Sequence, residues 1–244
     1  MTQLNSWKDR DEIKVEKEKT YRRFSRKSVF SDILEVFMVN RGLFFTFKEL
    51  AIRPGKIISG YLGTKREKVT GPVKYFFLAV GLLTFFVLRY THTEYLSGQF
   101  DNIDNDHTEE VADHFQTYFL DHLNLWSALG VLFFAWMSKI FWKKQGLFYM
   151  EHLVINLFMS AQANFYTLFL LPLTFLIGPD RFQLVEVVVI FIYYLFAFQQ
   201  VFRQKFSVTL WKTILVLVLG YMLFFMAVML LGFGFGIYIA LSSG

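Results

Sequence analysis

The chain has 244 residues, of which 55% are hydrophobic, 20% aromatic and only 18% charged. Soluble domains carry about 25% charged residues, so this composition argues against an ordinary water-soluble globule. The absence of cysteine excludes disulfides, thiolate metal sites and cysteine nucleophiles. The net charge of +5 is compatible with nucleic-acid binding at first sight, but its distribution along the chain indicates another origin.

Residues 1–71 are predicted to form a cytoplasmic, basic region with short amphipathic helices, and no cleavable signal peptide is expected in them. Apolar residues at helical spacing predict the first amphipathic face: Phe30, Ile33, Leu34, Phe37 and Met38. Thr46 and Glu49 have capping-box spacing, so a short helix is expected to begin near Thr46 and to end before Pro54. A further turn or two is expected over 56–62.

Five long apolar segments follow, and we predict that each is a transmembrane helix. Such a helix needs about 20 residues to cross roughly 30 Å of hydrocarbon. The predicted spans are residues 72–89, 123–142, 147–177, 184–202 and 213–240. Pro72 suits the first turn of the first span, and Pro172 interrupts the third. The expected fold class is therefore all-α, a polytopic integral membrane protein with a five-helix domain over 72–241.

The positions of the charged residues predict the topology. Of the 25 Lys and Arg, 23 lie within residues 1–74, 139–146 and 203–212, whereas the 91–122 loop has eight acids and neither Lys nor Arg. The positive-inside rule then places the N-terminus in the cytoplasm and both the 91–122 loop and the C-terminus outside. The charge that resembled a nucleic-acid signal is explained by topology, and nucleic acid is not an expected partner.

The basic N-terminal region has two interpretations. Residues 1–74 carry 17 Lys and Arg against nine acids, enough to favour anionic membrane lipid. Helices with Phe-rich faces and basic flanks are typical of the head-group region, where they can bind lipid or a protein partner. Alternatively, the cluster only stops translocation and has no binding role.

A family resemblance starts within this region. The segment from Asp32 to Phe86 resembles the core of an uncharacterised bacterial membrane-protein family, domain of unknown function 3667. The residues that carry the resemblance are Arg41, Gly42, Thr46, Lys48, Glu49, Leu50, Arg53, Pro54, Gly55, Ile58, Tyr61, Arg66 and Pro72. Glu151-His152-Leu153 is also similar. Many members begin with a cysteine-rich, zinc-ribbon-like segment that is not found in this sequence, so no metal role there is carried over.

The resemblance implies a multi-pass protein of the bacterial cytoplasmic (inner) membrane and supplies no activity. It makes six motif residues candidates for an interface: Arg53, Pro54, Gly55, Tyr61, Arg66 and Pro72.

Polar residues form a ridge along the third predicted span. After Glu151 they recur every four positions, at His152, Asn156, Ser160 and Asn164, and so share one helix face. The ridge is interpreted either as a hydrophilic pathway, with His152 as a proton acceptor, or as interhelical hydrogen bonding. In the second case Glu151 would pair with Lys143 or Lys144.

The acidic loop offers a weak metal candidate. Glu110, Asp113 and His114 would share one face of a helix and could hold a divalent cation, although an acidic, solvated cap is the favoured explanation of these residues. Gly232 and Gly236 have small-xxx-small spacing, which favours close helix packing within the bundle or in a homo-oligomer.

No catalytic pattern is found, so neither an enzyme nor a cofactor is expected. The sequence favours a non-enzymatic membrane scaffold or accessory factor. The alternative is a small transporter or channel that uses the polar ridge of the third span.

Overall fold

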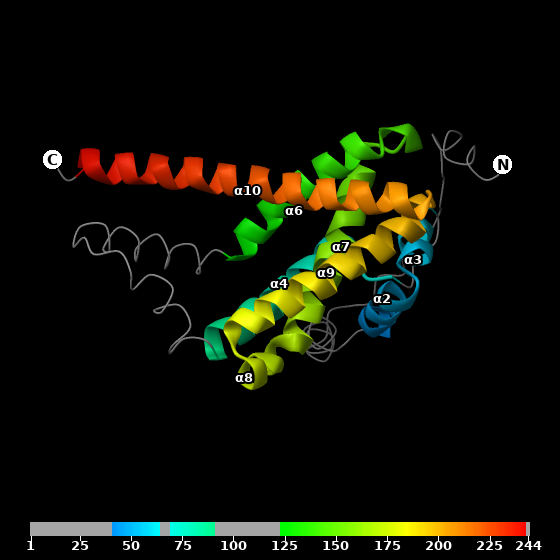
Figure 1. Ribbon diagram of the computed structural model, residues 1–244, viewed down its shortest axis with the longest axis horizontal. Helices are drawn as coiled ribbons and strands as arrows, with labels where there is room; N and C mark the ends of the chain where they lie inside the picture. The colour runs from blue at the N-terminus through cyan, green and yellow to red at the C-terminus, as the bar shows by residue number, and fades with distance from the viewer. Residues whose placement is uncertain (1–40, 64–68, 91–122, 243–244) are drawn as a thin grey trace, which may run out of the picture. The chain divides into compact units, whose positions relative to one another are not determined.

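A computed structural model describes residues 41–63, 69–90 and 123–242, and all regular structure in these ranges is helical (Figure 1). The chain divides into two units, Met1–Asn40 and Arg41–Gly244. The first unit lies outside the described residues, and so does the helix predicted over 30–38. Arg66 and the loop candidates Glu110, Asp113 and His114 also lie outside them.

Two short helices precede five long ones, and several short elements connect them. The long helices are α4 (Pro72–Tyr90), α6 (Leu123–Phe141), α7 (Tyr149–Leu170), α9 (Pro179–Phe202) and α10 (Phe206–Ser242). The shorter elements are α2 (Arg41–Ile52), α3 (Pro54–Leu62), η3 (Lys143–Gln145), η4 (Leu171–Leu173) and α8 (Thr174–Ile177). An all-helical fold is therefore confirmed for the described part of the chain.

Three stretches are long and apolar enough to cross a membrane: Tyr149–Ile177, Pro179–Phe202 and Phe206–Gly232. They correspond to the third, fourth and fifth predicted spans. The apolar stretches Pro72–Val87 and Leu125–Phe141, in α4 and α6, are shorter. The described part of the chain thus contains three helices long and apolar enough to cross a membrane, and the two additional spans stay a prediction.

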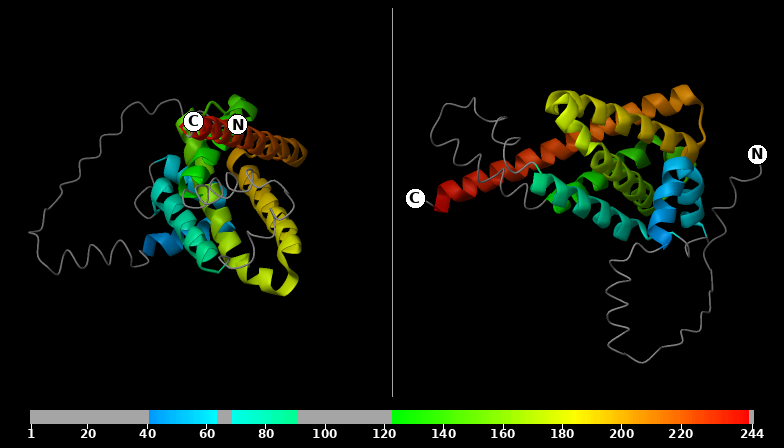
Figure 2. Two further views of the ribbon diagram at one scale, coloured as in Figure 1. Left: turned by 90° about the vertical axis from the view of Figure 1, so that its left-hand side faces the viewer. Right: turned by 90° about the horizontal axis from the view of Figure 1, so that it is seen from below.

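Helix α7 is the centre of the bundle. It packs against α4, α6 and α9 and is also contacted by α2 and α3, whereas α10 packs on α6 and α9 (Figures 1 and 2). The core between these helices contains several large side chains with almost no exposed surface, among them Trp142, Tyr75, Phe76, Phe158 and Phe198. Helix α7, the third predicted span, and the helices around it therefore share one apolar core.

Two tight turns depend on glycine. Gly146 (φ 70°) follows η3 before α7, and Gly178 (φ 77°) separates α8 from α9. A positive φ is readily available to glycine because it has no Cβ. Pro172 lies in η4, directly after α7, so the predicted interruption of the third span is present as a change from α- to 3₁₀-helix.

The boundaries around the family-like segment were predicted in part. Helix α2 ends at Ile52 and α3 ends before Gly63, as expected. The predicted capping box is wrong, because α2 already includes Arg41 and Thr46 lies inside it. The Thr46 hydroxyl donates to the carbonyl of Gly42 (2.6 Å) and accepts from the amide of Thr70 (2.9 Å). Thr46 therefore joins α2 to the segment that leads into α4.

Candidate functional site

The predicted polar ridge is on α7 and points partly into the bundle. His152 and Asn156 have no exposed surface, while Ser160 and Asn164 are half-buried. The Nδ1 atom of His152 is 2.5 Å from the Ser138 hydroxyl of α6, and the His152 ring stacks on Phe202 of α9 at 5.8 Å. These contacts place the imidazole at the junction of three helices.

The other residues of α7 bind two further neighbours. The hydroxyls of Ser160 and Tyr194 are 2.8 Å apart, which connects α7 to α9. Gln162 does not share the four-residue spacing of the ridge, yet it is fully buried and its Oε1 accepts a 2.5 Å hydrogen bond from Tyr75 of α4. Helix α7 is thus bonded through side chains to α4, α6 and α9.

Glu186 of α9 was missed as a site residue. Its carboxylate accepts a hydrogen bond from the Thr167 hydroxyl at 2.6 Å, so a second side-chain hydrogen bond joins α7 to α9. The signal available in the sequence was a lone acid in an otherwise uncharged apolar stretch. Such residues are costly in a membrane and mark candidate sites.

Some buried polar atoms of this cluster have no hydrogen-bond partner within the described part of the chain. They include His152 Nε2, Asn156 Oδ1 and Gln162 Nε2. Asn156 uses its Nδ2 on the carbonyl of His152 at 2.8 Å, so its amide is only half satisfied. Buried polar atoms of this kind cost free energy unless water or a ligand pairs with them.

Glu151 does not pair with Lys143 or Lys144, the partners expected if the ridge serves helix packing. Its Oε2 accepts a hydrogen bond from the Phe148 amide at 2.8 Å, across the first turn of α7. Ion pairing with Lys143 or Lys144 is not found, because the carboxylate turns back to cap its own helix. A carboxylate in the first turn also interacts favourably with the helix dipole.

Three basic segments meet at one end of the bundle. Gln145 of η3 donates from its Nε2 to the carbonyl of Phe202 at 3.3 Å. The Gly55 amide of α3 donates to Oε1 of Gln200 at 3.3 Å. These bonds bring the end of α9 together with the 142–146 turn and the start of α3, and the cations in or beside these segments are Lys143, Lys144, Arg203, Lys205, Arg53 and Lys56.

The motif Arg53-Pro54-Gly55 forms the contact between α3 and α9. Pro54 and Gly55 are both buried, and a Cβ at position 55 would lie only 2.5 Å from the carbonyl oxygen of Gln200. The lack of a side chain therefore allows α3 to touch the α9 backbone. Tyr61 adds an edge-to-face contact with Phe158 of α7 at 5.2 Å.

Pro72 and Arg53 differ from each other in burial. Pro72 begins α4, as predicted, and is buried. Arg53 is exposed beside α2. The family-like residues thus divide into a buried set that joins helices and an exposed, charged set.

The outer face of α2 is apolar and basic at once. Phe44, Ile52 and Phe45 are 66%, 51% and 39% exposed, and Lys48 of the same helix is also exposed, while the exposed cations Arg53 and Lys56 follow directly after α2 and in α3. Phe47 points the other way and packs edge-on against Phe165 and Phe169 of the bundle, at 5.6 Å from each. Helix α2 therefore has one face for the bundle and one face free for another surface.

Within the described ranges, no group of three His, Asp or Glu side chains is close enough to hold a metal ion. The chemistry available at the two surfaces is hydrogen bonding at α7 and charge with aromatic contact at α2.

Comparison with known proteins identifies one segment. No curated protein and no solved structure matches the chain. Residues 40–84 match the family described as Protein of unknown function (DUF3667), which confirms the resemblance predicted from the motif residues. The matched segment comprises α2, α3 and most of α4. It therefore includes both the exposed face of α2 and helices that pack into the core.

Proposed function

We propose that the protein is a non-enzymatic scaffold of the bacterial inner membrane, whose cytoplasmic α2 helix lies on anionic lipid. The observation that carries the proposal is the exposed face of α2, where Phe44, Phe45 and Ile52 accompany Lys48, with the exposed Arg53 directly after the helix. An amphipathic helix with aromatic and cationic side chains on one surface is suited to the head-group layer.

The five-span topology is part of the same proposal. Helices α4 and α6 have 19 residues each, about the length that a membrane crossing requires. Spans one to five would then alternate in direction. The meeting of the basic 142–146 and 203–205 segments with α3 at one end of the bundle supports a cytoplasmic position for that end. The C-terminus would be external.

The energetics favour lipid as the partner of α2. Burial of one large apolar side chain contributes about 1.5–3 kcal/mol, and each Lys or Arg near an anionic surface adds about 1 kcal/mol. The summed free energy of two phenylalanines and two or three cations is larger than that of a marginal surface contact. Because α2 is already attached to the bundle by Phe47 and Thr46, little entropy is lost when its outer face enters the head groups.

Photo-crosslinking from α2 tests the proposal. The photoreactive residue p-benzoylphenylalanine is placed at position 44 or 45 of the full chain, which is reconstituted in nanodiscs of phosphatidylglycerol and phosphatidylcholine. Irradiation should give lipid adducts, with phosphatidylglycerol favoured over phosphatidylcholine, as read by mass spectrometry.

The matched control uses the same helix. The same photoreactive residue at position 47 should crosslink within the chain, because Phe47 packs against Phe165 and Phe169. If positions 44 and 45 also react only within the chain, or react with both lipids equally, the anionic-lipid proposal is wrong. Adducts to one protein in native membranes would instead identify a protein partner.

The unpaired atoms of α7 favour a second candidate, a small transporter or channel. A solute or proton pathway would explain why His152 Nε2 and Asn156 Oδ1 are buried without partners. Replacement of both residues by leucine distinguishes the candidates. Loss of solute or proton flux in liposomes, with thermal stability retained, would support transport, whereas an unchanged flux would exclude it.

A further inference from the structure

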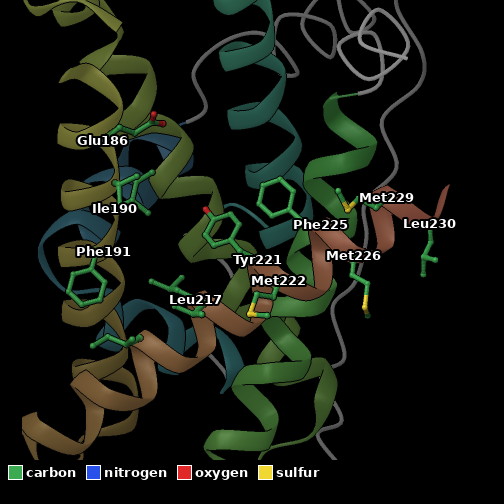
Figure 3. A pocket seen from close by; sticks show the side chains of 13 residues that line it. Glu186, Ile190, Phe191, Leu217, Tyr221, Met222, Phe225, Met226, Met229 and Leu230 are labelled. Atoms are coloured by element: carbon green, nitrogen blue, oxygen red, sulfur yellow. The ribbon is translucent and has the colours of Figure 1, made fainter. Parts of the chain in front are cut away.

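A long apolar groove lies between the first half of α9 and the middle of α10 (Figure 3). Its volume is about 1150 Å³, somewhat above the roughly 300–1,000 Å³ of ordinary small-molecule pockets. On α10 it extends from Ile214 to Leu230, about 24 Å at 1.5 Å per residue. One leaflet is half of the roughly 30 Å hydrocarbon core, so the whole groove is longer than the apolar part of one leaflet.

The lining has a single charged residue, Glu186, among aliphatic, aromatic and methionine side chains. No Lys or Arg is among the residues that line the groove. The Thr167 hydroxyl donates to Oε1 of Glu186, and no cationic side chain in the described ranges forms an ion pair with this carboxylate. A carboxylate in an apolar environment needs an opposite charge or a donor.

Tyr221 supplies the other polar group of the groove. Its ring is held edge-on by Phe134 of α6 at 5.0 Å, and its hydroxyl points to the side of the groove where Glu186 lies (Figure 3). Glu186 is seven residues into α9, about 10 Å from the helix start. Tyr221 lies about midway along the Ile214–Leu230 lining of α10, so the two polar groups have apolar lining on either side, about 10 Å of α10 towards Ile214 and about 13 Å towards Leu230.

We propose that this groove is a binding site for an aminophospholipid, with the primary ammonium group paired to Glu186 and one acyl chain along α10. Charge complementarity selects the head group, because the groove offers an acceptor without a cation. Glu186 accepts a hydrogen bond from the ammonium group, which a quaternary ammonium cannot donate. Tyr221 donates to an oxygen of the same head group. The site is on α9 and α10, separate from the exposed face of α2.

Native mass spectrometry of the full chain tests the site. The protein is released from nanodiscs with equal amounts of phosphatidylethanolamine, phosphatidylcholine and phosphatidylglycerol, and the retained lipids are counted. We expect a preference for phosphatidylethanolamine that falls about tenfold in Glu186→Gln, the size expected for one charge-assisted hydrogen bond. The amide can still accept from Thr167, so this variant keeps the helix contact.

Matched variants control for charge and shape. Asp180→Asn removes an exposed carboxylate from the start of the same helix and should leave the preference unchanged. Met222→Trp fills the groove and should reduce retention of phosphatidylethanolamine, whereas Leu215→Trp lies on α10 outside the groove lining and should not.

Three results would overturn the proposal. They are equal retention of the three lipids by the unmodified chain, an unchanged preference in Glu186→Gln, and a dimer whose groove is closed by a second copy. Photo-crosslinking at position 44 should be the same in Glu186→Gln, so failure at this site is distinguishable from failure at α2.

Discussion

Helices α7 and α10 are both long and apolar, but they occupy opposite kinds of environment. Over an 18-residue apolar segment, 56% of the candidate span that contains α7 is buried inside the bundle, against 17% of the corresponding segment of α10. Helix α10 has the higher mean hydropathy of the two. The more hydrophobic helix is therefore the more peripheral one, the reverse of the order in a water-soluble protein.

The difference follows from the solvent. Lipid is as apolar as leucine, so an aliphatic side chain gains little when it moves from lipid into the bundle. Hydrogen-bonding groups gain more, because lipid offers them no partner. His152, Asn156 and Gln162 therefore place α7 in the centre, while the exposed Met222, Phe225 and Met229 leave α10 at the lipid boundary.

The same substitution in both helices should show the largest contrast. Met159 has no exposed surface, so Met159→Ala leaves a cavity in the core and should lower the free energy of unfolding by about 3 kcal/mol. Met229 is 76% exposed, and Met229→Ala should change it by less than about 0.5 kcal/mol. SDS titration of the purified protein measures both. Equal effects would mean that α10 is packed as tightly as α7.

Removal of one polar partner should reveal what holds α7. Gln162→Leu leaves the buried hydroxyl of Tyr75 without its acceptor and should cost about 2 kcal/mol. Adding Tyr75→Phe removes the unpaired group and should recover most of that loss. The double-mutant cycle in SDS titration checks this. If the second substitution makes the protein still less stable, the hydrogen bond does not explain the position of Gln162.

Two glycines differ in the space around them: Gly220 lies where α10 contacts α6, whereas Gly81 lies on α4. A Cβ at Gly220 would overlap the ring of Phe134, so Gly220→Ala should destabilise the protein by about 1 kcal/mol. Gly81 of α4 has no atom within 4 Å of that position, and Gly81→Ala should stabilise by up to about 1 kcal/mol through helix propensity. Opposite signs in thermal unfolding are expected. Stabilisation by both would show that α10 can move away from α6.

The smallest effect is expected at the basic start of α10. Lys212 Nζ lies 5.5 Å from the centre of the Trp142 ring and donates to Gln204 at 2.9 Å. Lys212→Gln should cost about 0.5–1 kcal/mol, the range of a cation–π contact. Lys144→Gln is the control, since Lys144 is exposed, and should cost nothing measurable. An equal loss from both would attribute the effect to net charge.

The helices of the membrane domain were largely predictable. Pro72 begins α4 and Pro172 follows α7 as expected, because proline restricts the backbone wherever it occurs. The end of α2 before Pro54 has the same origin. These signals are local, and tertiary contacts rarely override them.

The start of α2 was not predictable in the same way. Thr46 and Glu49 have the spacing of a capping box, but that spacing also occurs inside a helix. Thr46 instead bonds to Gly42 and Thr70, and the second partner is 24 residues away. A short-range pattern contains no information about such a contact.

The candidate site was half predictable. Spacing of four residues placed His152, Asn156 and Ser160 on one face, and two of them are buried. It could not indicate the partners, Ser138 and Tyr194, which belong to other helices. Gln162 and Thr167 lie off the ridge, yet they bind α4 and α9, because a central helix presents several faces to its neighbours.

The sequence by itself determined that the described part of the chain is helical, that it contains helices apolar enough to cross a membrane, and which residues of α7 are too polar to face lipid. Periodicity, hydropathy and proline are sufficient for this because they act within one helix. Only the tertiary structure decided that α7 is central and α10 peripheral, that Gly55 contacts the backbone of α9, and that Glu186 lies in an apolar groove. The physical reason is that these properties depend on which helices are neighbours, and contact partners far apart in the chain have no local signature.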